Sequence, residues 1–240
     1  MKTIGLIGGM SWESTAVYYR MLNEAARAAS GGLASADILL HSVEFAEIVA
    51  LQKAGRWDLC AGLLADSAKR LEAGGAACVL ICTNTMHLVA PHVAASVDIP
   101  LIDIIDETGA ALKAAGRTKP LLLATRYTME HGFYADRMEM LHGIRPLVPE
   151  PEDRALVHAV IFDELCQGKV LDASREAVLE VIARGHAAGA DSVILGCTEI
   201  CLLLDPDRLE LPGFDSTAIH VAAAHRFATQ HDQLRERLTA

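Results

Sequence analysis

Apolar runs of strand length alternate with amphipathic stretches along the first half of the chain. Residues 3–8 form an apolar run that ends in glycines, and Ser11 follows as a helix N-cap with Glu13 in the first turn. This order predicts a strand, a glycine loop and a helix. The same patterns predict strands at 38–40, 77–82 and 99–103 and helices at 63–71 and 107–114.

The pattern starts again near residue 120. It predicts strands at 120–125 and 192–196 and helices at 129–140, 178–187 and 219–237. An offset of 114 residues (189 − 75) superposes Gly75-Ala76 on Gly189-Ala190 and Thr83 on Cys197. The two halves therefore look like a duplicated βα unit.

Strand runs without polar alternation are typical of parallel sheets that helices cover on both faces. We therefore predict an α/β fold of two pseudo-symmetric, doubly wound, mostly parallel α/β lobes with the active site between them. The predicted first lobe comprises residues 1–117 plus 212–240, and the second comprises 118–211. Ligands of such sheets bind beyond the carboxyl ends of the strands, where Thr83 and Cys197 are expected to lie.

Composition and charge narrow the classes of function. Hydrophobic residues make up 52% of the 240 residues, which excludes a disordered chain. The formal net charge of -10 argues against a nucleic-acid partner and against an anionic membrane surface. No window approaches 18 uninterrupted apolar residues, and the first residues enter a strand directly, so we expect a cytoplasmic protein.

The cysteines predict reduced thiols rather than a disulfide framework or a metal site. Cys78 and Cys82 are four residues apart, as are Cys197 and Cys201, whereas zinc knuckles use closer pairs. Cys60, Cys78 and Cys201 have apolar or helical surroundings and are interpreted as small buried hydrophobes. The first glycine loop does not fit G-x-G-x-x-G, which argues against a dinucleotide cofactor.

Cys197 is the strongest candidate for a reactive side chain. It stands between Gly196 and Thr198, at the end of a predicted strand and near the start of a predicted helix. Backbone N–H groups at a helix start favour a thiolate, so we expect a lowered pKa and a role as base or nucleophile. The alternative is a buried small hydrophobe.

Polar residues near Thr83 and Cys197 suggest how an anion is held. Asn84, Thr85 and Thr198 offer donors that suit a carboxylate, although helix N-capping is the alternative. His87 follows Thr83 by one helical turn and is either within reach of the reacting centre or a hydrogen-bonded structural histidine. His41 is a weaker candidate of the same kind.

Four ordered motifs resemble the cofactor-independent aspartate/glutamate racemase family, in its amino-acid racemase branch. They are 4–11 (IGLIGGMS), 82–87 (CTNTMH), 123–128 (LATRYT) and 196–200 (GCTEI), and the resemblance covers essentially the whole chain. It implies two pseudo-symmetric lobes, no metal and no pyridoxal phosphate or other cofactor. It also implies racemisation by two residues on opposite faces of the substrate's α-carbon.

Carried onto this sequence, the resemblance implies that Thr83 and Cys197 are the catalytic pair. The residues expected to bind the substrate or support the pair are Met10, Gln52, Asn84, Thr85, Thr125, Tyr127, Thr128 and Thr198, with His87 and Glu199 in support. The expected partners are a small-molecule amino-acid substrate and, in a homodimer, a second copy of the chain. No nucleic acid and no membrane are expected.

The chain departs from the family at Thr83, because the usual Cys-Asn-Thr-x-His motif has a thiol at that position. Cys82 precedes Thr83 by one residue, and adjacent side chains of a strand point to opposite faces, so Cys82 cannot replace that thiol. Cys197 is then the only good base of the pair. In this family the second-lobe cysteine faces the α-proton of the L-enantiomer, so we expect L-substrates to be favoured.

The side-chain anchors of the substrate also differ. The cationic residues that stricter aspartate racemases use fall near Ile48 and Cys166 in this sequence. Gln52 lies one helical turn after Ile48 and is the nearest polar replacement, with a solvated surface residue as the alternative.

Two other readings stay open. A single thiol also fits a hydantoin racemase, or a decarboxylase or isomerase of the same superfamily. A reading from a different functional class is a non-catalytic amino-acid-binding protein, in which the threonine at position 83 is the result of a loss of catalysis. Release of carbon dioxide, cis-trans isomerisation, or ligand binding without α-hydrogen exchange would distinguish these readings.

Overall fold

The computed structural model describes residues 1–239, with side chains described for residues 1–230. The chain divides into two compact units. The first comprises Met1–Asp103 with His220–Ala240, and the second comprises Ile104–Ile219. Within the described residues, no helix is long and apolar enough to cross a membrane.

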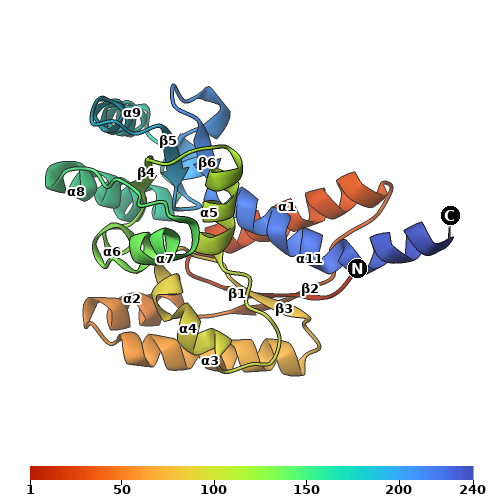
Figure 1. The fold of residues 1–240 in the computed structure, drawn as a ribbon. Helices are drawn as coiled ribbons and strands as arrows, with labels where there is room; N and C mark the ends of the chain where they lie inside the picture. Colours follow the sequence, from red (N-terminus) through yellow and green to blue (C-terminus); the bar gives the residue numbers. More distant parts are fainter. Residues whose placement is uncertain (240) are drawn as a thin grey trace. The chain divides into compact units, whose positions relative to one another are not determined.

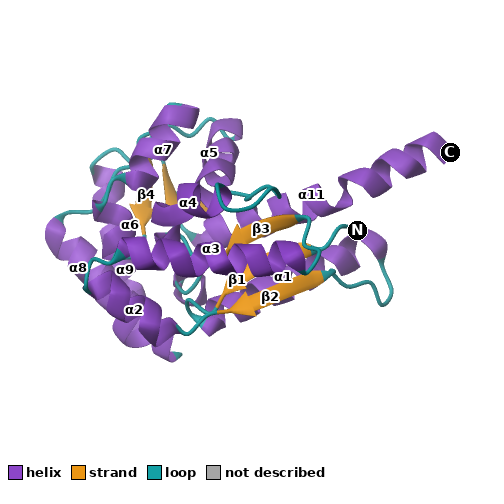
Figure 2. Cartoon of the chain, turned by 90° about the horizontal axis from the view of Figure 1, so that it is seen from below, coloured by secondary structure: helices purple, strands orange, loops and turns teal. Residues whose placement is uncertain are grey.

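A parallel three-stranded sheet forms the centre of the first unit. Its strands are β1 (Ile4–Gly8), β2 (Ile38–Ser42) and β3 (Cys78–Ile81), in the order β2-β1-β3. Figure 2 shows β1 between its two neighbours. A parallel bridge between Val79 and Leu101 extends the sheet beyond β3. Of the strand predicted at 99–103, only this bridge at Leu101 forms.

Helices cover both faces of the first sheet, as Figure 1 shows. They are α1 (Trp12–Ser30), α2 (Phe45–Lys53), α3 (Trp57–Ala73), the 3-10 turn η1 (Thr85–Val89), α4 (Ala90–Ala94) and α11 (Ser216–Thr239). On one face, Tyr18 of α1 and Ala224 of α11 pack against Leu6. On the other, Leu64 of α3 packs against Ile81. Alternate strand residues thus serve two separate cores, which is why β1 and β3 have no polar positions, whereas the partly exposed strand β2 carries His41 and Ser42.

The second unit repeats this plan. Its strands are β4 (Pro120–Leu123), β5 (Ser192–Leu195) and β6 (Gly213–Asp215), all parallel and in the order β4-β5-β6, with a bridge from Leu121 to Leu147 beside β4. The two sheets have the same order when the isolated bridges are included. The bridge at Leu147 takes the place of β2, β4 that of β1, β5 that of β3, and β6 that of the bridge at Leu101. The duplicated α/β architecture with parallel sheets, predicted from the sequence, is therefore confirmed.

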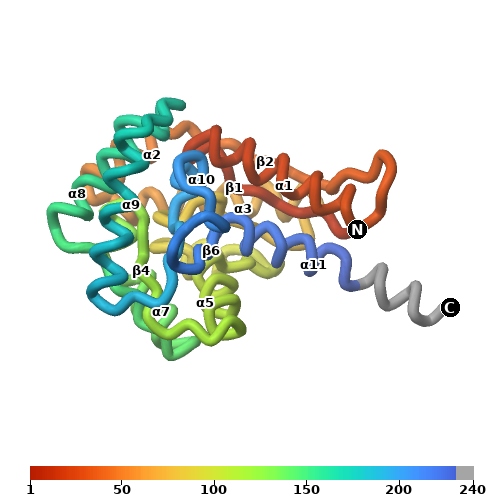
Figure 3. Tube along the Cα trace, turned by 90° about the horizontal axis from the view of Figure 1, so that it is seen from above, coloured from red at the N-terminus to blue at the C-terminus, as the bar shows by residue number. Residues whose placement is uncertain are grey.

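Helices also cover both faces of the second sheet. They are α5 (Ile104–Ala114), α6 (Arg126–Glu130), α7 (Phe133–His142), α8 (Pro151–Ala159), a π-helical turn η2 (Val160–Glu164), 3-10 turns η3 (Leu165–Gln167) and η4 (Pro206–Arg208), α9 (Asp172–Ala187) and α10 (Ile200–Leu203). Val157 and Val181 pack on one face, and Ile105 and Tyr134 on the other. Figure 3 shows α10 and β6 along the path that leads into α11.

Two boundaries differ from those read in the sequence. The predicted first lobe extends to residue 117, but α5 lies in the second unit because Ile104 and Leu112 are buried with Leu122 and Tyr134. The predicted second lobe ends at residue 211, but β6 pairs with β5 and belongs to the second unit as well.

The helix predicted at 129–140 is also divided. α6 ends at Glu130, and α7 begins at Phe133. Gly132 has φ +77° and therefore interrupts the helix, because a right-handed helix needs negative φ.

Candidate functional site

In the first unit, the predicted site residues lie on the segment that follows β3. Thr83 is partly buried, whereas Asn84, Thr85 and His87 are buried. The Thr83 N–H donates to the Ile81 carbonyl at 2.8 Å. The Nδ1 of His87 lies 2.8 Å from the Thr83 carbonyl, which can only accept, so Nδ1 carries the hydrogen. His87 is therefore the hydrogen-bonded residue that fastens the turn at Thr83.

Cys82 is a residue of the buried core of the first unit. Its side chain is buried in the cluster that contains Leu6, Tyr18 and Val221, on the sheet face covered by α1 and α11. Burial raises the pKa of the Cys82 thiol well above its usual value. Cys82 is thus a core residue that is held in its neutral form.

Gln52 is buried rather than solvated. Only 7% of it is exposed, and its Nε2 donates to the Sδ of Met86 at 3.1 Å. A thioether is a weak acceptor, so this amide is held loosely compared with an amide that faces a carbonyl. Met10 and Ile48 are buried in the cluster that also contains Met86. Gln52 therefore contacts the residue that follows Thr85, and Met10 belongs to the same buried cluster.

The first glycine loop is shaped by the protein's own backbone. A Cβ on Gly9, where φ is +89°, would lie 2.3 Å from the Val43 carbonyl oxygen, and one on Gly8 would lie 2.5 Å from Thr15. The Gly9 N–H donates to the Thr15 hydroxyl at 2.8 Å. The loop is glycine-rich because the start of α1 and the end of β2 approach it closely.

His41 belongs to a structural network. Its Nδ1 lies 2.9 Å from the Ser67 hydroxyl, and its Nε2 lies 2.9 Å from Nη1 of Arg70. The Ser67 hydroxyl donates to the Leu63 carbonyl. The Ser67 hydroxyl therefore accepts a hydrogen bond from His41 Nδ1–H and donates its own hydrogen to Leu63 rather than to His41, so His41 is not placed to act as a base toward Ser67.

In the second unit, Cys197 lies beyond β5 and is hydrogen-bonded to a carboxylate. Its Sγ donates to Oε2 of Glu199 at 3.0 Å, and both side chains are buried. Burial raises the pKa of Cys197, and the charge of Glu199 raises it further. The predicted lowering of this pKa is wrong, because α10 is a single turn that begins only at Ile200 and a carboxylate faces the thiol.

Thr198 meets a residue that sequence reasoning missed. Its hydroxyl lies 3.2 Å from the hydroxyl of Thr217 at the start of α11, and the Thr217 N–H donates to Asp215. The Ser216 hydroxyl donates to the Leu195 carbonyl. The run Asp215-Ser216-Thr217 carries the signature of a helix start, which was the available signal for these residues.

Thr125 and Thr128 form a helix cap. Thr125 is the N-cap of α6, and its hydroxyl accepts the Thr128 N–H at 3.4 Å and lies 3.1 Å from the Thr128 hydroxyl. Tyr127 contacts the rings of His131 and His158. Burial lowers the pKa of His158, a residue that the sequence motifs did not include.

The remaining cysteines differ from Cys197 in their surroundings. Cys166 and Cys201 are partly buried against the cluster that contains Cys197. Burial raises the pKa of Cys60, of Cys78 to about 11, and of Cys201. Among the side chains that the structure describes, no three His, Cys, Asp or Glu residues are grouped to hold a metal ion.

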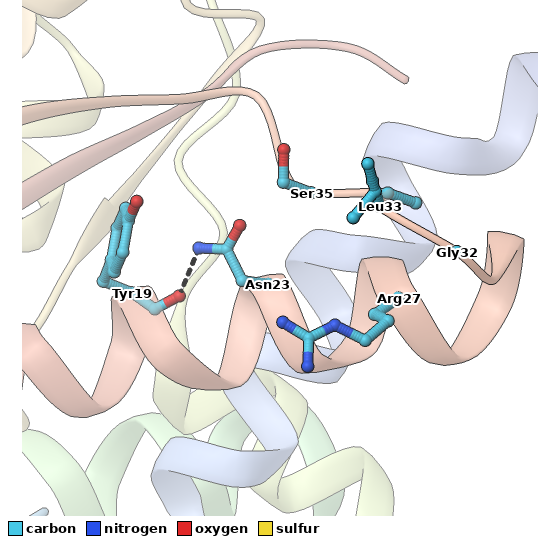
Figure 4. A pocket seen from close by; sticks show the side chains of 7 residues that line it. Tyr19, Asn23, Arg27, Gly32, Leu33 and Ser35 are labelled. Atoms are coloured by element: carbon cyan, nitrogen blue, oxygen red, sulfur yellow. Dashed lines mark hydrogen bonds between the residues drawn. The ribbon is translucent and has the colours of Figure 1, made fainter.

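A pocket of about 600 Å³ lies elsewhere in the first unit (Figure 4). It is lined by Tyr19, Asn23, Arg27, Gly32, Leu33, Ala34 and Ser35. Asn23 donates to the Tyr19 carbonyl and accepts from the Ala36 N–H, so it fastens the loop after α1. None of the lining residues is a predicted site residue.

Comparison with known proteins is consistent with the motifs. The profile of the Asp/Glu/hydantoin racemase family matches residues 7–224. A structure from Yersinia pestis, described as a putative Asp/Glu racemase, is 47% identical with a TM-score of 0.89, covering 96% of this chain and 100% of that one. An aspartate racemase homologue from Pyrococcus horikoshii is 32% identical with a TM-score of 0.84, and the match covers 95% of this chain and 100% of that one.

More distant structures share the fold. Picrophilus torridus aspartate racemase is 23% identical with a TM-score of 0.76, and the match covers 95% of this chain and 94% of that one. The family profile spans nearly the whole sequence, and two structures above 30% identity match along their full length. The chain belongs to the Asp/Glu/hydantoin racemase family.

Proposed function

We propose that the chain is a cofactor-independent amino-acid racemase that acts on aspartate or glutamate and favours the L-enantiomer. Cys197 removes the α-proton, and Thr83 returns one on the opposite face. The observation that carries the proposal is the buried hydrogen bond from the Cys197 thiol to the Glu199 carboxylate in a member of this family. A thiol paired with a proton acceptor is an activated base or nucleophile.

Glu199 has a defined role in this reaction. The raised pKa of Cys197 means that its resting form is the thiol. The Sγ–H proton passes to Oε2 of Glu199, and the thiolate then takes the α-proton of the substrate. The cost of forming a thiolate in a buried site is thereby offset by a neighbour that loses its charge in the same step.

Thr83 serves the other face as a proton donor. A hydroxyl ionises far less readily than a thiol, so Thr83 gives a proton to the carbanion more readily than it removes one from a substrate. Solvent restores the Thr83 proton, and the proton held by Glu199 returns to solvent, so the reaction is balanced. The equilibrium constant stays at one, and the preference for L-substrates is confined to rates and binding.

Asn84, Thr85 and Thr198 are proposed to hold the α-carboxylate. Asn84 and Thr85 are buried beside Thr83, and Thr198 is buried between Cys197 and Glu199. Removing one such donor is expected to weaken transition-state binding by about 1–3 kcal/mol. Gln52 offers the substrate side chain a neutral amide, which its weak bond to Met86 leaves available to a stronger acceptor.

Hydrogen exchange in deuterated water tests the proposal. L- and D-aspartate and L- and D-glutamate are followed by NMR with no added cofactor, and we expect α-deuteration from the L side first. Cys197→Ala should abolish exchange, whereas Cys201→Ala, which changes a second thiol packed on the same cluster, should leave it intact. An active, folded Cys197→Ala variant contradicts the assignment. Ligand binding without any exchange contradicts the activity itself.

A further inference from the structure

Three buried aromatic side chains connect α1, α11 and the turn after β3 within the first unit. Tyr18 and His220 are fully buried, and the Tyr18 hydroxyl lies 2.9 Å from Nδ1 of His220. The His220 ring contacts the His87 ring edge-on, with centroids 5.9 Å apart. His87 in turn holds the Thr83 carbonyl. Neither Tyr18 nor His220 has a role in the reaction described above.

The hydrogens of this array can be assigned from its partners. Nε2 of His220 lies 2.8 Å from the Ile102 carbonyl, which only accepts, so Nε2 carries a hydrogen. Burial keeps the imidazole neutral, with the pKa of His220 lowered to about 3. Nδ1 of His220 therefore accepts the Tyr18 hydroxyl, and donation runs from Tyr18 to His220 to the Ile102 carbonyl.

This array constrains Thr83 through His87. The peptide group before Thr83 is held by the bond to the Ile81 carbonyl, and the one after it is held by the His87 Nδ1–H. Bonds on both sides of one Cα set the direction of its side chain. The His87 ring can hold this orientation because the His220 ring, itself fixed at both nitrogens, packs against it.

We propose that Tyr18 and His220 are positioning residues that orient His87 and, through it, the hydroxyl of Thr83. This inference rests on the proposed function, in which Thr83 returns the proton. It predicts that disturbing the pair impairs inversion of the substrate and spares removal of the α-proton by Cys197. A misplacement of the donor by about 1 Å is enough to lower such a step about a hundredfold.

The test separates inversion from exchange with retention. L-substrate is incubated in deuterated water, and the rates of α-deuterated L-product and of D-product are measured in one sample. His220→Gln keeps a donor for Ile102 but removes the ring from His87, and Tyr18→Phe keeps the ring but removes the hydroxyl. We expect inversion to fall about tenfold or more in each, with retention changed less than about twofold.

Two further variants serve as the control and the comparison for this measurement of inversion and retention. Val221→Ala removes buried side-chain volume from α11 beside His220 and should leave the ratio of inversion to retention unchanged. Thr83→Ala should reproduce the fall in inversion. A loss of packing alone lowers both rates together, and that outcome for His220→Gln and Tyr18→Phe overturns the proposal.

Imidazole nitrogen chemical shifts supply a readout that does not depend on turnover. In the wild type, we expect hydrogen on Nδ1 of His87 and on Nε2 of His220. In His220→Gln, the His87 signal should move toward a mixture of tautomers. An unchanged His87 tautomer in both variants overturns the positioning role. If the wild type exchanges no amino acid, the proposed function fails, and these shifts still decide whether the pair orients His87.

Discussion

The buried imidazole of His220 makes the first unit sensitive to acid. Burial is the main cause that lowers its pKa from 6.5 to about 3, and the neighbouring His87 lowers it further, while the Ile102 carbonyl and Asp103 act in the opposite direction. In the unfolded chain the imidazole has its ordinary pKa, so between these two values the unfolded state binds a proton that the folded state excludes. Stability is therefore retained above pH 6.5 and lost progressively as the pH falls toward 3.

Linkage gives the size of the effect. With a pKa of 6.5 unfolded and about 3 folded, the loss is about 2 kcal/mol between pH 7.5 and pH 5. It approaches about 5 kcal/mol once the pH falls below 3. This is a large fraction of the stability of a typical domain, which is about 5–15 kcal/mol. His220→Gln removes the titrating group and should remove this pH dependence.

The two tryptophans provide an assay that reports on one unit. Trp12 and Trp57 both belong to the first unit, and the chain has no other tryptophan. Urea unfolding followed by fluorescence at several pH values should show the free energies of the wild type and His220→Gln converging by about 2 kcal/mol between pH 7.5 and pH 5. Val221→Ala should shift the free energy equally at each pH. Parallel curves for the wild type and His220→Gln would refute the reasoning.

Three further predictions concern other parts of the chain. Cys82→Ala should keep turnover but lower the unfolding free energy, measured in thermal melts, by about 1–2 kcal/mol, because it removes a buried sulfur atom from the core. Cys197→Ala should instead abolish turnover with little loss of stability. Glu199→Gln should lower the pKa of Cys197 because a negative charge is removed, yet reduce kcat about a hundredfold because the proton acceptor is lost. The rate of Cys197 alkylation as a function of pH measures the first effect, and steady-state kinetics measure the second. Gly9→Ala should lower the unfolding free energy by more than about 1 kcal/mol, because its Cβ meets the Val43 carbonyl at positive φ, and a variant as stable as the wild type would contradict this.

Hydrophobic patterning predicted β1, β3, β4 and β5 well because these strands are buried along their whole length. It did not predict β6, a three-residue strand that is only partly buried and ends in Asp215. The 114-residue offset likewise anticipated that β3 and β5 occupy equivalent places in the two sheets. Patterning assigned α5 to the first lobe, whereas it belongs to the second unit, because an amphipathic helix shows that it buries one face but not which sheet it covers. The place of α5 depends on Ile104 and Leu112 meeting Leu122, a contact made only in the folded chain.

The candidate site was predictable at the level of motifs and not at the level of electrostatics. The segments that contain Thr83 and Cys197 follow strands, and their sequences single them out. The pKa of Cys197 depends on the side-chain direction of Glu199, which local sequence leaves open, so the predicted shift had the wrong sign. Tyr18 and His220 lie 202 residues apart, and no local pattern could pair them.

The division of the chain also sets the order in which the two units are completed during synthesis. The second unit is one uninterrupted segment, Ile104–Ile219, and is synthesised before the part of α11 that belongs to the first unit. The first unit needs the last helix, since Val221 and Ala224 cover the sheet face formed by Ile4 and its neighbours. That face stays uncovered while the residues between β3 and α11 are made, although its strands emerge first. During synthesis, the segment Ile104–Ile219 is therefore complete before the first unit is, and the apolar face of the first sheet stays uncovered until α11 has been made.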